Sequence, residues 1–143
     1  YGLAGMRIGY ALANPAVADI LNRIRQPFNV SAIAQASAVA ALGDEEFLLQ
    51  SIMVNVMGMK QLTAGFEMRG IEYIKSYGNF ISFAVENANA VFNNLLRQGV
   101  IVRGIANYGM PDCLRVSVGL ESENQRFLTA LDVSMASAVV ATG

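Results

Sequence analysis

Two arginines in the last third of the chain stand in a pattern that suits anion binding. Residues 114–118 alternate between apolar and polar side chains, so Arg115 and Ser117 lie on the face opposite the apolar ones. Arg103 ends the preceding β-rich stretch, one turn-rich loop before Arg115. Two cations that converge on one surface repel each other unless an anion lies between them. This convergence is the reason to suspect a phosphate or carboxylate site. For Arg115 taken by itself, the residues favour a solvated position at a sheet edge over a carboxylate clamp.

A third arginine, Arg7, lies in a segment of small and apolar residues, 5–12, that is punctuated by glycine. This pattern predicts a buried strand that other backbone approaches closely. A cation there needs a partner, because an unpaired buried charge is costly. A guanidinium suits phosphate, since its planar donors can bind two oxygens at once. The residues alone leave a phosphate contact and a structural ion pair open for Arg7.

The residue inventory excludes several other kinds of active site within this chain. It has one cysteine, Cys113, and no histidine, so Cys/His zinc sites, Ser-His-Asp triads and Cys-His dyads cannot form, and we expect no metal site. A net charge of −1 without a lysine–arginine stripe argues against nucleic acid as a partner. The glycines at 2, 5 and 9 match neither a dinucleotide-binding nor a Walker spacing. No self-contained active site is visible.

Composition indicates one domain of ordinary size, with a surface apolar enough to suggest that another protein surface covers part of it. With 143 residues, 54% of them hydrophobic, the chain is long enough to bury a core. Charged residues make up only 15%, and the mean hydropathy is +0.40. No apolar run approaches the ~18 to 20 residues that span a bilayer, and no charged segment precedes an apolar stretch at the N-terminus. We expect a cytoplasmic protein with no membrane partner.

Helix signals dominate the first half. Asn14 followed by Pro15 predicts a helix that ends before Pro27, and Ser31 can cap an alanine-rich helix to about Leu42. Apolar residues at three- and four-residue steps predict a third helix over 44–69, which at about 25 residues would be roughly 37 Å long. One small core cannot cover such a helix, so we expect it to bridge two lobes.

The pattern then changes to strands. Residues 79–85, 100–103 and 114–118 are β-rich, and helices are predicted between the first two and from Ser122 onward. The predicted fold class is α/β, with a small α+β lobe in which helices cover one face of a three-stranded sheet. Residues 132–143 lack an amphipathic pattern, and we expect a frayed tail or an altered C-terminus there.

The first ten residues form a specific motif, which reads Tyr-Gly-Leu-Ala-Gly-Met-Arg-Ile-Gly-Tyr. It resembles the segment of histidinol-phosphate aminotransferases, fold-type-I enzymes that use pyridoxal phosphate (PLP), that directly follows the lysine holding the cofactor. The resemblance extends to about Leu131, through landmarks in the family's order and at close to its spacing. These landmarks are 25–30, 77–80, 99–103, 107–111 and 114–120.

The resemblance implies a role for several residues. Arg7 would contact the PLP phosphate. Arg115 would receive the α-carboxylate of glutamate and 2-oxoglutarate, and also meet the phosphate end of histidinol phosphate, with Arg103 as a second substrate-anion contact. Asn79 would lie at the edge of the cleft and help position the small lobe, whereas the residues alone favour a turn. Gly104 stands where the family commonly has proline, which predicts a looser loop after it.

The resemblance also divides the chain into parts. Residues 1–45 would be the end of the large PLP-binding lobe, 46–131 the long helix and small lobe, and 132–143 an atypical tail. The cofactor lysine would stand two residues before Tyr1, so we expect this chain to carry no catalytic residue and to bind no PLP covalently. Lys60 and Lys75 are its only lysines, and both are expected to be solvated.

Two functions are compatible with these observations. The chain is either the C-terminal part of a PLP-dependent aminotransferase, inactive alone, or a free-standing truncated module for interaction or assembly. The complete enzyme would exchange an amino group between histidinol phosphate with 2-oxoglutarate and imidazole-acetol phosphate with glutamate, in histidine biosynthesis. Aromatic aminotransferases and threonine-phosphate decarboxylases share much of the pattern. An upstream reading frame ending in Ser-Lys-Ala favours the first function, and a start codon near Tyr1 the second.

The strand predicted over 5–12 would have both edges open, and the helices at 15–25 and 31–42 would lack a sheet to cover. Exposing that much apolar surface predicts a homo-oligomer, most simply a dimer, that pairs through this strand or through the long helix.

Overall fold

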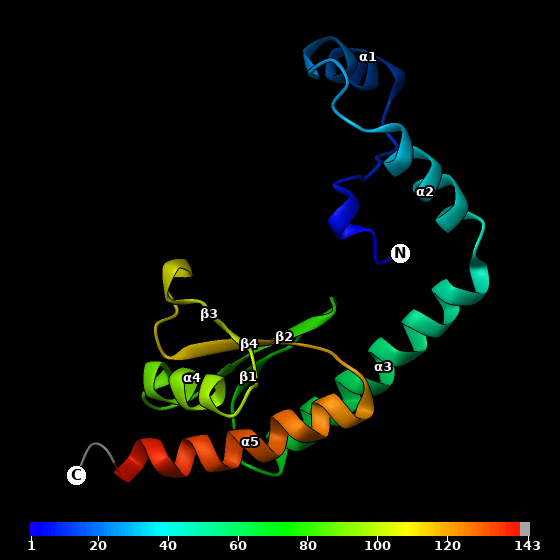
Figure 1. Cartoon of the computed structure of the whole chain (residues 1–143). Coiled ribbons are helices and arrows are strands. Elements are labelled where there is room, and N and C mark those ends of the chain that lie inside the picture. Colours follow the sequence, from blue (N-terminus) through cyan, green and yellow to red (C-terminus); the bar gives the residue numbers. More distant parts are fainter. Residues whose placement is uncertain (141–143) are drawn as a thin grey trace. The chain divides into compact units, whose positions relative to one another are not determined.

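The computed structural model describes residues 1–140 (Figure 1). The chain divides into two compact units, Tyr1–Ser51 and the residues from Ile52 onward. The division falls inside the long helix α3 (Glu45–Glu67). None of the helices within 1–140 is both long and apolar enough to cross a membrane. The assignment of the first unit to a cofactor-binding lobe stays a prediction.

The first unit consists of short helices and has almost no core of its own. Its elements are η1 (Ala4–Met6), α1 (Pro15–Ile24) and α2 (Ala32–Leu42). The predicted caps are confirmed, since Asn14 Oδ1 accepts the backbone N–H of Ala16 at 3.0 Å and Ser31 Oγ accepts that of Ala34 at 3.2 Å. Ala34 is the one buried residue among residues 1–51.

The prediction of a buried strand over residues 5–12 is wrong. A 3₁₀ turn occupies Ala4–Met6, and residues 8–12 have no regular structure. Arg7 ends the turn with a left-handed backbone, at φ 53°. A strand exists only where a neighbour takes up its backbone donors and acceptors, and residues 1–51 include no strand at all. Arg7 is therefore exposed and not buried as the pattern suggested.

The predicted long helix is confirmed as α3, with 23 residues. Asp44 Oδ1 accepts the backbone N–H of Phe47 at 3.0 Å, and two glutamates in the first turn suit the positive end of the helix dipole. The C-terminal half of α3 packs closely against the next helices. A Cβ added at Gly65 would lie 2.6 Å from Leu128 Cδ1, so a larger residue there would require the Leu128 side chain to move.

The second unit contains an antiparallel sheet of four strands, one more than predicted, in the order β1-β2-β4-β3. The strands are β1 (Tyr73–Ile74), β2 (Phe80–Ala84), β3 (Arg103–Gly104) and β4 (Cys113–Ser117). The remaining elements are α4 (Ala88–Arg97), η2 (Ala106–Tyr108) and α5 (Glu121–Val140). Two-residue strands such as β1 are too short to show an alternation of apolar and polar side chains, so the sequence does not predict them.

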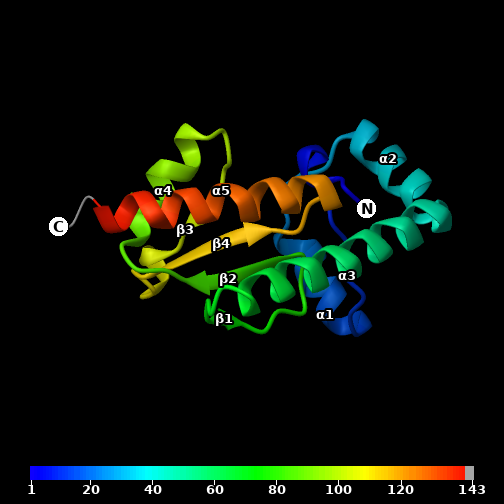
Figure 2. The same cartoon turned by 90° about the horizontal axis from the view of Figure 1, so that it is seen from below.

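The core lies between one face of this sheet and the helices, as predicted. In Figure 1, α4 and α5 lie on the same side of the sheet, and Figure 2 shows the molecule from that side. Phe66 stacks on Phe83 with ring centroids 4.9 Å apart, and the ring of Phe127 meets both edge-on. The larger aliphatic core residues are Leu62, Ile71, Ile81, Val85, Val91, Leu95, Val102, Leu114, Val116, Leu128 and Leu131.

The expectation of a frayed tail is wrong for residues 132–140, which continue α5. Asp132 forms an ion pair with Arg69 at 2.6 Å, and Ser134 is fully buried and accepts a hydrogen bond from Gln98 Nε2 at 2.8 Å. Ala138 belongs to the hydrophobic core and Met135 packs against it, so this part of α5 has an inward face built from small residues and one methionine. Residues 141–143 of the predicted tail lie outside the described residues.

Candidate functional site

The face of the sheet opposite the core carries both predicted anion-binding arginines. The strand register aligns one residue from each strand in a row, namely Ile74, Ser82, Arg115 and Arg103. Arg103 on β3 is directly opposite Arg115 on β4, and residues so paired project from the same face. The register thus places the two arginines on one face of the sheet, and their convergence on a common concave site stays a prediction.

Each of the two arginines contacts an aromatic side chain. The guanidinium carbon of Arg115 lies 4.4 Å from the ring centroid of Phe80, which begins β2. Arg103 Nη2 donates to the hydroxyl of Tyr108 at 3.2 Å, and its guanidinium carbon lies 5.8 Å from that ring centroid. Within residues 1–140, neither arginine forms an ion pair with a carboxylate; the ion pairs found there join other residues.

Two adjacent cations without a counter-ion are an unfavourable arrangement for a sheet. Like charges directly opposite one another on neighbouring strands destabilise the pair. Arg103 is exposed and Arg115 is half-buried, so an anion can reach this face. The arrangement is suited to a phosphate or carboxylate that accepts hydrogen bonds from both guanidinium groups.

Asn79 lies at the end of the same sheet, in the turn before β2. Its backbone carbonyl accepts the N–H of Val118 at 2.8 Å, beyond the end of β4, and the residue is exposed. The preceding carbonyl, that of Gly78, accepts from Asn55 Nδ2 of α3 at 3.2 Å. This turn is therefore fixed to both the sheet and the long helix. Its role at a cleft edge stays a prediction.

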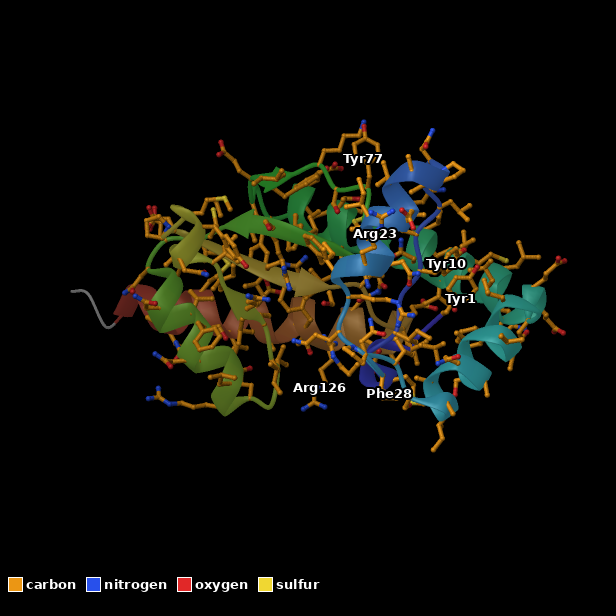
Figure 3. The ribbon with its side chains drawn as sticks, turned by 90° about the horizontal axis from the view of Figure 1, so that it is seen from above. Tyr1, Tyr10, Arg23, Phe28, Tyr77 and Arg126 are labelled. Carbon is orange, nitrogen blue, oxygen red and sulfur yellow. The ribbon has the colours of Figure 1, made fainter. Side chains whose placement is uncertain are left out.

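Arg7 belongs to the first unit, and its lack of a carboxylate partner among residues 1–140 suits a phosphate ligand. Its Nη1 donates to the carbonyl of Ala4 at 3.2 Å. A hollow of about 300 Å³ lies nearby, between the N-terminal segment and α2, but its lining is mostly apolar and includes Tyr1 and Tyr10, labelled in Figure 3. This hollow does not suit an anion.

The two lysines are exposed, as predicted. Lys75 Nζ lies 5.3 Å from the ring centroid of Tyr77, and Lys60 is on α3.

Three residues of the sheet face were not singled out from the sequence. Alternation over 79–85 places Phe80 and Ser82 opposite the core residues of β2, so this signal could have found them. Tyr108 lies in a 3₁₀ turn, where no periodicity predicts the direction of a side chain.

Comparison with known proteins identifies the family of this chain. The family model for aminotransferase class I and II matches residues 1–131. The histidinol-phosphate aminotransferase of Methylobacillus flagellatus is 57% identical over 132 residues, covering 92% of this chain and 36% of that protein. Histidinol-phosphate aminotransferase 2 of Pseudomonas fluorescens is 58% identical over 132 residues with the same shares. The chain thus spans about a third of the length of these relatives.

Solved structures show the same fold. The histidinol-phosphate aminotransferase of Sinorhizobium meliloti, in complex with pyridoxal-5'-phosphate, superposes with a TM-score of 0.84 at 29% identity, covering 96% of this chain and 39% of that one. The enzyme of the same name from Clostridium acetobutylicum has a TM-score of 0.85 at 22% identity, with 95% and 43% covered. The predicted fold class and family resemblance are confirmed: the chain belongs to the aminotransferase class I and II family.

Proposed function

We propose that this chain supplies the substrate-anion contacts, and one contact to the cofactor phosphate, of a PLP-dependent histidinol-phosphate aminotransferase. The proposal rests on the pair Arg103 and Arg115, which lie directly opposite each other on the neighbouring strands β3 and β4. Within residues 1–140, neither of them has an ion-pair partner. The names of relatives at 57% and 58% identity support the substrate assignment.

The positions of the two guanidinium groups suggest which part of the substrate each would bind. Arg115, half-buried in the central part of the sheet, would take the α-carboxylate of glutamate or 2-oxoglutarate through paired hydrogen bonds, and would also meet the phosphate end of histidinol phosphate. Arg103, more exposed and close to a loop, would be the second contact to the substrate anion. Asn79 would border the cleft and keep the turn before β2 in place.

Arg7 would hold the cofactor phosphate. PLP, when bound, supplies the electron sink for amino transfer. Among residues 1–140, Arg7 uses only Nη1 for a hydrogen bond within the chain, so its other donors can point to phosphate oxygens. Lys60 and Lys75 are the lysines of this chain, and the family resemblance assigns neither of them to the cofactor.

The assembled protein is expected to be a homo-oligomer, most simply a dimer, in the cytoplasm. The support is the exposed apolar surface of the first unit, in which Ile24 and Phe28 are 72% and 98% exposed. No nucleic-acid or membrane partner is expected.

Substitution of Arg115 in an active enzyme tests the proposal. A suitable enzyme joins the N-terminal part of the Methylobacillus flagellatus relative to this chain. We expect Arg115→Ala to lower kcat/KM for glutamate by an amount equivalent to about 2 to 5 kcal/mol, because the carboxylate loses its charged partner. Arg97→Ala is the matched control, since Arg97 lies on α4 and bonds only to Asn94 among the described residues. Equal kinetics for the two variants would refute the role of Arg115.

A further inference from the structure

The contact between Arg115 and Phe80 is unusual for a half-buried arginine, which more often pairs with a carboxylate. The distance of 4.4 Å from the guanidinium carbon to the ring centroid is well within the ~6 Å range of a cation–π contact. A carboxylate partner would neutralise the charge and occupy N–H donors of the guanidinium. An aromatic face does neither, so the cation keeps both its charge and its donors for another anion.

We propose that Phe80 is a positioning residue, whose ring holds the guanidinium of Arg115 in the orientation that binds the substrate anion. This inference rests on the proposed function, because it presumes that Arg115 is an anion contact. It adds a residue whose apolar side chain cannot itself bind an anion and acts only through its neighbour.

The backbone around Phe80 is fixed well enough to serve this purpose. Phe80 is directly opposite Ser117, and Arg115 is opposite Ser82, so ring and guanidinium are diagonal neighbours on one sheet face. The turn before Phe80 is held by the bond from Val118 N–H to the Asn79 carbonyl. Phe80 is 37% exposed and is not part of the buried core, so substituting it leaves the packing between sheet and helices intact.

The neighbouring Tyr77 provides a matched control. It precedes the same strand, and its ring also contacts a cation, with Lys75 Nζ at 5.3 Å. Tyr77 is 89% exposed, and Figure 3 shows it extending outward from its loop. A general effect of removing an aromatic ring from this segment would appear in Tyr77→Leu as well as in Phe80→Leu.

The experiment is an NMR titration of the whole chain, with ¹⁵N-labelled arginine and inorganic phosphate as the probe, against sodium chloride at equal ionic strength. We expect phosphate to shift the Arg115 Nε–H signal. Phe80→Leu should weaken phosphate binding about 2- to 5-fold, the fold-change that corresponds to an exposed cation–π contact. It should also abolish the ring-current shift of the Arg115 side chain and increase its mobility. Phe80→Tyr should keep all of these properties, and Tyr77→Leu should match the parent.

The outcomes separate this inference from the function on which it rests. If the parent binds phosphate at Arg115 and Phe80→Leu binds it equally well, Phe80 has no positioning role and the anion site stands. Equal weakening by Tyr77→Leu would also overturn the inference. If phosphate leaves Arg115 unaffected in the parent, the anion site and the inference both fall. The methyl signals of Leu114 and Val116 show whether each variant is folded. If Phe80→Leu does not fold, Phe80→Met replaces it, with the same expected weakening of phosphate binding.

Discussion

At the scale of single residues, the paired arginines of the sheet face are the main departure from what stability alone would favour. A cross-strand pair of like charges lowers stability, and the contacts of these arginines with Phe80 and Tyr108 leave both charges in place. Binding sites commonly keep such unfavourable groups because the ligand compensates them.

Removing one of the two charges should therefore stabilise the free chain. We expect Arg103→Gln to raise the free energy of unfolding by about 0.2 to 1 kcal/mol at low salt, because the repulsion of Arg115 is relieved. The gain should shrink as salt rises, since the Debye length falls to about 3 Å at 1 M. Urea denaturation at several salt concentrations measures it, with Arg97→Gln as the control. A loss of stability that does not depend on salt would show that the two charges do not repel each other appreciably.

Alternation was sufficient to place Arg115 opposite the core residues, whereas placing Arg103 beside it also required that the two strands be neighbours. The aromatic partners were harder to predict, because a ring that meets a guanidinium diagonally depends on the register between β2 and β4. The pattern of residues along one strand does not predict its register with a neighbouring strand. Tyr108 depends in addition on the conformation of a short 3₁₀ turn.

At the scale of elements, α5 is attached to the end of α3 by a two-pronged ion pair. Arg69 Nε and Nη2 donate to the two carboxylate oxygens of Asp132 at 2.6 and 2.7 Å. The hydrogen bonds from Arg69 lower the pKa of the Asp132 carboxyl below its ordinary value of 3.8, and the same contact raises the pKa of Arg69. The pair stabilises the region that the sequence suggested was frayed.

Because the pKa of Asp132 is lower in the folded chain, its contribution to stability is present above the unfolded pKa and is lost as pH falls through the folded pKa. We expect Asp132→Asn to reduce the free energy of unfolding at pH 7 by no more than about 1 kcal/mol, since Asp132 is half exposed and solvent screens the pair. The difference from the parent should shrink as pH falls below the ordinary Asp value and vanish once pH is below the folded pKa.

Urea denaturation across that pH range is the measurement, with Asp112→Asn as the control for loss of an exposed carboxylate. A difference between Asp132→Asn and the parent that persists unchanged in acid would mean that the ion pair is not its source.

Element prediction succeeded where the signal was local and failed where pairing decided the outcome. Asn14 and Ser31 each cap a helix as expected, and Asp44 caps a third, because a cap requires only neighbouring backbone. Residues 5–12 were expected to form a strand, but a strand needs a partner that residues 1–51 do not provide. The helix through 132–140 was missed because the groups that it contacts, among them Arg69, Gln98 and the hydrophobic core, are remote in sequence.

At the scale of the whole molecule, the two units differ sharply in how well they bury their apolar residues. The second has a continuous core between sheet and helices, whereas the first buries only Ala34 among residues 1–51. The opening motif of ten residues belongs to this first unit, together with the candidate phosphate ligand Arg7. The first unit is expected to gain its core from further polypeptide, from a second copy, or from both.

Amino transfer by an assembled enzyme tests the central claim most directly. The N-terminal part of the Methylobacillus flagellatus histidinol-phosphate aminotransferase, joined to this chain in place of its own matching segment, should form glutamate from 2-oxoglutarate when histidinol phosphate is supplied. We predict a kcat/KM within about tenfold of that relative's own, since a loss of about 1.4 kcal/mol is the most that imperfect joining should cause. A folded chimera that binds pyridoxal phosphate and yet forms no glutamate would contradict the account.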